Sequence, residues 1–216
     1  YNIEELILYI EALFLAAGMD ADKSAIVAQL LVEADLMGHT THGIAQAPAY
    51  LSGLENGLML GTGDPIIVSD RGATITWDGQ RISGVWLTAM AIDLSVDRAK
   101  KYGTATMAIR RSGHIVCLDA FLTRATDKGC MIELASSDPS IVSVAPYGGT
   151  KPAFTPNPIA IGIPTNKNPI LIDISASITT NGLTGRLFSE GKKLPGDWVQ
   201  DKSGRATNDP SVLFTE

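Results

Sequence analysis

The pattern that decides the fold lies in residues 85–109, VWLTAMAIDLSVDRAKKYGTATMAI. Apolar residues recur there on one helical face: Leu87, Met90, Ala91, Leu94 and Ala99. This spacing predicts a helix over residues 85–101, which Gly103 ends. The run at residues 104–109 predicts a strand directly after it. A helix that alternates with strands is typical of an α/β sheet covered by helices.

The alternation continues on both sides of this stretch. Apolar and β-branched runs predict further strands at residues 65–68, 73–77, 131–135, 158–163 and 169–174. Another helix is expected at residues 118–127. The sequence therefore predicts an α/β fold for most of the chain beyond residue 57.

The first 57 residues have a different texture. Residues 3–14 carry apolar side chains at helical spacing, and Gly18 follows as a stop signal. Asp20 or Asp22 is expected to cap a second helix. A third, short helix is expected through Tyr50. We therefore expect an N-terminal helical subdomain over residues 1–57 and a second domain over residues 58–216.

Composition limits the classes of function. Of the 216 residues, 45% are hydrophobic and 19% are charged, as in a soluble globular protein. The net charge of −6 argues against a nucleic-acid partner, which would need a basic surface. Neither a signal peptide nor a membrane-length apolar run is evident, so we expect a cytoplasmic protein without a membrane partner. Cys117 and Cys130 are expected to be reduced, buried thiols.

The segment Gly38-His39-Thr40-Thr41-His42-Gly43 holds two of the three histidines of the chain. Histidine titrates near neutral pH, so it often transfers protons or binds metals. His42 lies between a hydroxyl that can orient its ring and a glycine that lets a ligand approach. These features are compatible with a catalytic acid or base. Taken alone, however, the residues favour a structural role at a helix end.

A metal pair is the third interpretation of His39 and His42, which are three residues apart. It needs a further ligand, for which His114, Glu33 and Asp35 are candidates. No HExxH or CxxC motif supports it, and we expect no metal.

Nucleotide-binding loops of the common types are absent from the sequence. No GxGxxG follows a predicted strand, and there is no GxxxxGK[ST]. However, Ser112-Gly113-His114 follows the strand that ends near residue 109, where α/β proteins place ligand-binding groups. A simple turn with a solvent-facing histidine is the alternative.

Eight short motifs occur in a distinctive order. They are residues 32–38 (VEADLMG), Thr41-His42-Gly43, Pro48-x-Tyr50, Arg110-x-Ser112-Gly113-His114, residues 145–149 (APYGG), residues 156–160 (PNPIA), Asp173-Ile174-Ser175-x-Ser177 and Leu194-Pro195-x-x-Trp198. In this order and spacing, the chain resembles the malate/L-lactate dehydrogenase family over nearly its whole length. That family is separate from the Rossmann-type dehydrogenases.

The resemblance implies an α/β fold with a mixed central sheet that binds NADH or NADPH without a GxGxxG loop. Residues 58–216 would form this cofactor-binding domain, cut short at its C-terminal end. The sequence does not choose between NAD and NADP. His42 would be the proton donor to the substrate, and Thr41 would orient its ring. The resemblance also implies a homodimer.

Cofactor contacts are implied for two segments. The first is His114, Ile115 and Val116, and the second is Asp173, Ile174 and Ser175. Both follow predicted strands.

Substrate contacts depart from the family pattern. Most members carry an arginine where this chain has Gln46, which can form hydrogen bonds but has no charge. The substrate-contacting threonine is either shifted by one position, to Thr155, or lost. After the Asp-x-Ser segment, Asn181 and Gly182 are followed by Leu183 instead of a polar residue. These positions are the predicted substrate contacts.

The sequence therefore predicts an NAD(P)-dependent oxidoreductase that interconverts a 2-hydroxy acid and its 2-oxo acid. The alternative is a non-catalytic or diverged relative that keeps the fold and binds a nucleotide. Gln46 and Leu183 are the reasons for retaining that alternative.

Overall fold

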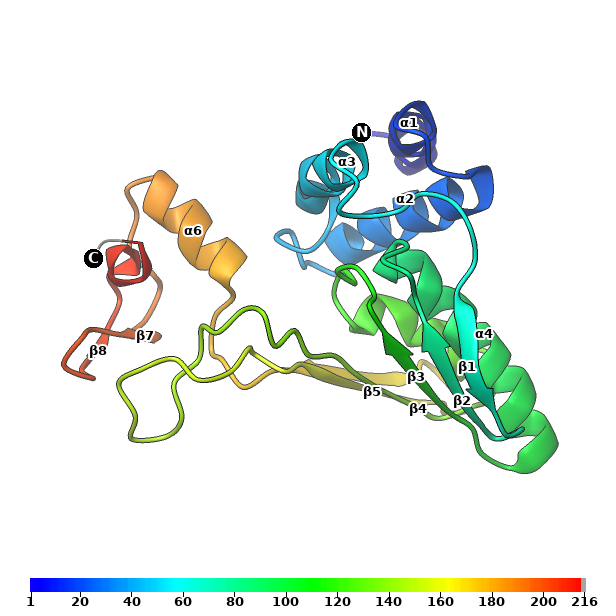
Figure 1. Ribbon diagram of the computed structural model, residues 1–216. Coiled ribbons are helices and arrows are strands. Elements are labelled where there is room, and N and C mark those ends of the chain that lie inside the picture. Colours follow the sequence, from blue (N-terminus) through cyan, green and yellow to red (C-terminus); the bar gives the residue numbers. More distant parts are fainter. Residues whose placement is uncertain (215–216) are drawn as a thin grey trace. The chain divides into compact units, whose positions relative to one another are not determined.

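The computed structural model describes residues 1–214, which fold as two compact units (Figure 1). The first unit comprises residues 1–133 and 161–172. The second comprises residues 134–160 and the described part of 173–216. The predicted boundary at residue 57 follows the change from helices to strands instead, and it stays a prediction.

The first unit begins with the predicted helices α1 (Ile3–Ala16), α2 (Ala21–Leu36) and α3 (Ala47–Glu55), with a 3-10 turn, η1 (Ile44–Gln46), before α3. α1 and α2 pack against each other. Asp20 is the N-cap residue of α2, as predicted. Its side chain makes no cap hydrogen bond, and its carboxylate accepts from Lys23 Nζ at 2.9 Å instead.

The first sheet has the order β1-β2-β3 and is mixed. β1 (Ile66–Asp70) pairs antiparallel with β2 (Thr74–Asp78), and β2 pairs parallel with β3 (Thr106–Arg110). Parallel neighbours require a crossover connection, which α4 (Gly84–Tyr102) supplies. These elements confirm the helix and strand predicted from residues 85–109.

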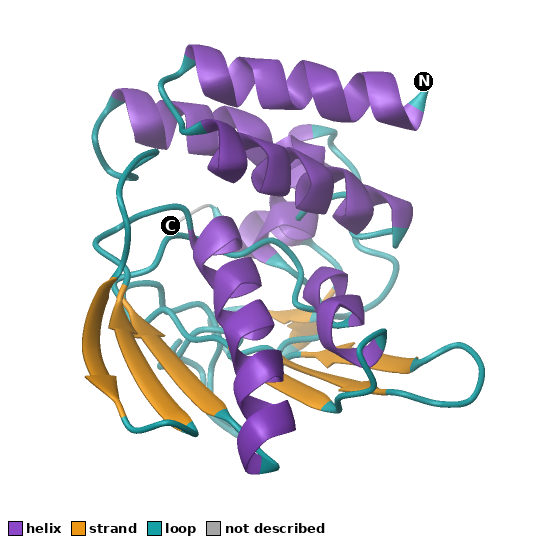
Figure 2. Ribbon diagram, turned by 90° about the vertical axis from the view of Figure 1, so that its right-hand side faces the viewer, coloured by secondary structure: helices purple, strands orange, loops and turns teal. Residues whose placement is uncertain are grey.

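α4 lies along this sheet (Figure 2). Ile75 and Trp77 of β2 form a buried cluster with Trp86, Leu87 and Ala91 of α4. Gly103 ends α4 in the left-handed conformation, with φ at 85°, which glycine adopts without steric cost. The packing of α4 therefore fixes where β2 and β3 end, and the loops at those ends reach the candidate site.

The helix predicted at residues 118–127 is wrong in detail. It consists of a 3-10 turn, η2 (Asp119–Phe121), and a short helix, α5 (Thr123–Thr126). The Phe121 N–H bonds to Leu118 O, three residues back, at 3.2 Å. Phe121 and Leu122 are fully buried, so tertiary packing overrides the expected helix.

A second sheet contains β4 (Ile132–Ala135), β5 (Ile159–Ile163) and β6 (Ile170–Ile174), in that order. All three strands were predicted. Residues of this sheet are divided between the two units. The second unit contains α6 (Asn181–Ser189), the strands β7 (Val199–Gln200) and β8 (Ala206–Thr207), and η3 (Pro210–Leu213). Within residues 1–214, no helix has both the length and the apolar character needed to cross a membrane.

Candidate active site

A tight turn after α2 carries the two neighbouring histidines. The His39 N–H donates to Ala34 O at 2.9 Å, which ties the turn to the last residues of the helix. His39 O then accepts from the N–H groups of His42 and Gly43, at 2.8 and 3.0 Å. The backbone at His42 is therefore held by hydrogen bonds on both sides.

Gly43 is required by close packing in this turn. The Asp35 carboxylate accepts a hydrogen bond from the Ile44 N–H at 2.9 Å. It occupies the space that a Cβ on Gly43 would fill. A larger residue at position 43 would displace Asp35 and loosen the turn.

The His42 ring is held through one nitrogen. Thr41 Oγ1 lies 3.0 Å from Nδ1, so the hydroxyl engages that atom. Gln46 Nε2 donates to Thr41 O at 2.7 Å and steadies the same peptide. With Nδ1 occupied, Nε2 is the nitrogen that can face a ligand.

The segment that carries His114 is fixed by buried charge. Asp78, at the end of β2, accepts from Arg110 Nε at 3.1 Å and from Arg111 Nε at 2.8 Å. The Arg111 hydrogen bond is the main reason that the pKa of the Asp78 carboxyl falls to about 2. The backbones of Gly84 and Gly113 also lie close together. A Cβ on Gly84 would therefore overlap the Gly113 carbonyl. Both contacts anchor the loop immediately before His114.

His114 stacks beside His42. The ring centroids are 5.8 Å apart, with 27° between the planes. Tyr50 of α3 places its hydroxyl 2.6 Å from His114 Nδ1. Burial raises the pKa of the Tyr50 phenol far above its usual value. Tyr50 therefore keeps its proton at neutral pH, and its hydroxyl can donate a hydrogen bond to Nδ1 of His114.

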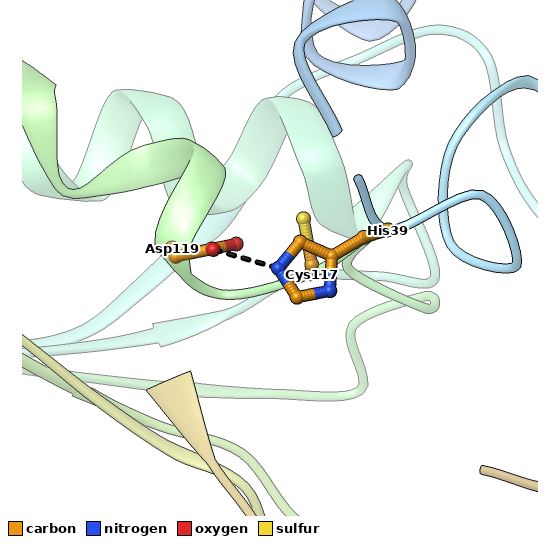
Figure 3. Close-up of side chains that lie close together, drawn as sticks. All are labelled: His39, Cys117 and Asp119. Atoms are coloured by element: carbon orange, nitrogen blue, oxygen red, sulfur yellow. Dashed lines mark hydrogen bonds and ion pairs between the residues drawn. The ribbon is translucent and has the colours of Figure 1, made fainter. Parts of the chain in front are cut away.

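His39 has different partners from His42. Its Nε2 lies 2.8 Å from Asp119 Oδ2, and Cys117 lies beside this pair (Figure 3). The predicted pairing of the two histidines as metal ligands does not appear among the candidate metal clusters of the described residues. Neither Cys117 nor Cys130 forms a disulfide; Cys117 is buried as predicted, whereas Cys130 is half-buried.

The remaining predicted site residues belong to the second unit. The Ala176 N–H donates to Pro156 O at 2.8 Å, which sets the segment containing Thr155 beside the one containing Ser175. Asn181 and Gly182 are exposed in the first turn of α6. Asn181 and Gly182 are therefore accessible at the surface of the second unit.

The groups predicted to contact the cofactor suit a nicotinamide dinucleotide in kind. Such a ligand needs an apolar surface for its ring and hydrogen-bonding groups for its sugars and amide. Ile115 is half-buried and Ile174 is 63% exposed, so both offer apolar surface. Ser175 offers an exposed hydroxyl, and Asp173 is half-buried. Val116 is fully buried and can contribute only through its backbone or by supporting the segment.

Sequence reasoning assigned no role to Tyr50 or Asp78, and it considered Asp35 only as a possible metal ligand. Tyr50 was visible in the Pro48-x-Tyr50 motif, but its bond to His114 spans 64 residues. No periodic pattern predicts such a contact. Asp35 lies within the motif at residues 32–38, but nothing in that motif indicates its bond to the Ile44 N–H, and Asp78 belongs to no motif.

Comparison with known proteins gives matches over the whole chain. The family described as malate/L-lactate dehydrogenase matches residues 1–216. L-sulfolactate dehydrogenase of Methanothermobacter thermautotrophicus is 29% identical, over 98% of this chain and 61% of its own length. Hydroxycarboxylate dehydrogenase B of Escherichia coli is 28% identical, over 99% of this chain and 59% of its own length. The chain thus spans about three fifths of these relatives.

A structural match gives the same result. Malate dehydrogenase from Entamoeba histolytica superimposes with a TM-score of 0.92 at 27% identity, over 99% of this chain and 59% of that one. The predicted α/β fold with a helical N-terminal part and a mixed sheet, distinct from a Rossmann fold, is confirmed.

Proposed function

The chain belongs to the malate/L-lactate dehydrogenase family. On this premise, we propose that it functions as an NAD(P)-dependent oxidoreductase that interconverts a 2-hydroxy acid and its 2-oxo form. The observation that carries this proposal is the held imidazole of His42, with Thr41 Oγ1 3.0 Å from Nδ1. Proton exchange with a substrate oxygen would use Nε2, the ring nitrogen that Thr41 does not contact.

When bound, the nicotinamide cofactor supplies or accepts the hydride at the substrate C2. In the reducing direction, His42 gives its proton to the carbonyl oxygen as that oxygen gains negative charge. In the oxidising direction, it takes the proton from the hydroxyl. Thr41 keeps the ring in one orientation, and Gln46 holds the Thr41 peptide. Thr41 therefore acts on the substrate through His42, whereas Gln46 is also proposed to contact the substrate directly.

His114 is proposed to contact the cofactor together with Ile115 and Val116. Its exposed ring stacks on His42, and Tyr50 fixes its Nδ1. Asp173, Ile174 and Ser175 are proposed as the second cofactor segment. Thr155, Asn181 and Gly182 are proposed to hold the substrate, together with Gln46. With Gln46 in place of a guanidinium, the substrate carboxylate would accept a hydrogen bond from a neutral amide instead of a bidentate pair of bonds from a cation.

His42→Asn tests the proton-transfer role. We expect kcat to fall by about 10²–10⁴-fold in a spectrophotometric assay with NADH or NADPH, because general acid catalysis is worth that much. If the His42→Asn variant kept the wild-type kcat, His42 would have no role in proton transfer. Thr41→Val should lower kcat less and alter the pH profile, and Thr41→Ser should restore both because it keeps the hydroxyl.

Substrate class requires a screen of 2-oxo acids and cyclic imines with both reduced cofactors. The relatives include sulfolactate, malate and hydroxycarboxylate dehydrogenases and a Δ1-piperideine-2-carboxylate reductase. We expect turnover of a 2-oxo acid. If fluorescence titration detects neither NADH nor NADPH binding, the proposed function fails.

The proposed assembly is a homodimer. Ile66, Ile67 and Val68 are exposed on β1, an edge strand of its sheet, and apolar edges of this kind are usually covered. Light scattering of the purified protein should give twice the chain mass. A monomer across the working concentration range would contradict this part of the proposal.

A further inference from the structure

Three potential metal ligands meet next to the two stacked histidines. They are His39, Cys117 and Asp119, whose ligand atoms all lie within 4.8 Å of one another. Figure 3 shows them converging from two segments, the turn after α2 and the chain leading into η2. His39 Nε2 and Asp119 Oδ2 are 2.8 Å apart although the residues are 80 positions apart in sequence.

The donor set selects among metals. A thiolate, an imidazole and a carboxylate together suit Zn²⁺, which accepts sulfur, nitrogen and oxygen ligands. Ca²⁺ and Mg²⁺ prefer oxygen ligands throughout and would not use the thiol. Zinc–ligand bonds are about 2.0–2.3 Å long, so ligand atoms around one tetrahedral ion lie about 3.3–3.8 Å apart. The ligand atoms of the three side chains, which lie within 4.8 Å of one another, are therefore spaced close to the separation that one ion requires.

The three potential ligands differ in how exposed they are to solvent. Cys117 is 6% exposed and Asp119 is 8% exposed, whereas the His39 side chain is 39% exposed. An ion could enter past His39, and the fourth position would remain open to water on that side. A usable metal site needs such an entry path.

We propose that His39, Cys117 and Asp119 bind one zinc ion that ties together the two segments carrying His42 and His114. The proposed ligands are close to both histidines along the chain. His39 O accepts the His42 N–H at 2.8 Å. Cys117 and Asp119 follow His114 within the same loop. A bound ion therefore holds the two stacked imidazoles at a fixed separation without contacting either.

Cobalt(II) titration of the purified protein tests this site without cofactor or substrate. One equivalent should produce thiolate-to-cobalt charge-transfer absorption and the visible bands of a tetrahedral ion. Zinc should abolish both signals with matching stoichiometry. Because the readout does not depend on turnover, it stands or falls separately from the proposed dehydrogenase activity.

Variants identify the ligands. Cys117→Ser should abolish the charge-transfer band, and His39→Asn and Asp119→Asn should each weaken zinc binding at least about 10–100-fold, the loss seen when even supporting residues of metal sites are changed. Cys130→Ser is the matched control and should bind as the wild type does. His39 is partly exposed, so His39→Asn should fold normally even if a buried replacement does not.

Two results would overturn the proposal. One is the absence of cobalt or zinc binding by the wild type at one equivalent. The other is equal binding by His39→Asn, Cys117→Ser and the wild type, which would indicate an adventitious surface ion.

Discussion

The two units differ in how they hold their side chains. Among residues 1–214, the large fully buried side chains of the first unit include Phe14, Leu31, Leu87 and Phe121. Among the described residues of the second unit, the buried positions are few and include Ala160, Thr184 and Leu194. The histidines of the first unit are therefore braced by a packed core, whereas the proposed ligand contacts of the second unit rest on turns and hydrogen bonds.

The largest expected effect comes from removing an aromatic ring from each unit. Phe14→Ala should lower the free energy of unfolding by about 3–5 kcal/mol, since it empties a fully buried site. Phe188→Ala should cost no more than about 1.5 kcal/mol, because its side chain is 40% exposed and loses mainly its stack on Phe214. Urea unfolding of both variants measures the difference. Equal losses would show that the second unit has a core as strong as the first.

Glycine-to-alanine substitutions should have opposite signs in the two units. Gly84→Ala should destabilise by about 1–3 kcal/mol, because the new Cβ overlaps the Gly113 carbonyl. Gly185→Ala in α6 should stabilise by about 0.5–1 kcal/mol, since its Cβ meets only Phe214 at an ordinary 3.5 Å. Thermal unfolding of each variant gives the sign. A stabilising Gly84→Ala would mean that the loop before His114 is free to move.

Acid should weaken both units, with a smaller effect in the second. The carboxyl pKa values of Asp78 and Asp201 are both lowered to about 2, by Arg111 for Asp78 and mainly by Ser203 for Asp201. An unfolded Asp titrates near about 3.9, so these contributions are complete above that pH and are lost as pH falls toward about 2.

The carboxylates of Asp78 and Asp201 differ in how far apart in the sequence their partners lie. Asp78 is buried and joins the ends of β2 and β3, whereas Asp201 serves a local turn. Asp78→Asn should therefore lower the urea midpoint at neutral pH more than Asp201→Asn does. Both differences from the wild type should shrink as pH approaches about 2. A constant deficit of Asp78→Asn across this range would show that its carboxylate charge contributes nothing.

The same contrast explains what could be predicted from the sequence. In the first unit, apolar periodicity and glycine stop signals predicted α1, α2 and α4, because those helices bury one face. In the second unit, α6 was missed: its first residues are Asn181 and Gly182, and its start depends on the Thr180 side chain, which accepts from the Leu183 N–H. Local capping of this kind leaves no periodic signal.

The site was predictable where its contacts are local. His42 and Thr41 are adjacent, so their bond follows from a short motif. The contacts of His114 with Tyr50 and of His39 with Asp119 join distant segments, and only the packing of α2, α3 and η2 creates them. Cys117 was expected to be a simple buried thiol, because nothing near it in sequence indicates its neighbours.

The 64-residue separation between Tyr50 and His114 also sets an order of assembly. Closing a long loop costs chain entropy that a turn of neighbouring residues avoids. During synthesis, the turn containing His42 can therefore form with α2 while His114 is still untranslated. We expect the second imidazole to arrive only after α4 and β3 have been made and packed. A nascent chain that has reached only α4 would thus carry His42 in its turn without its stacking partner.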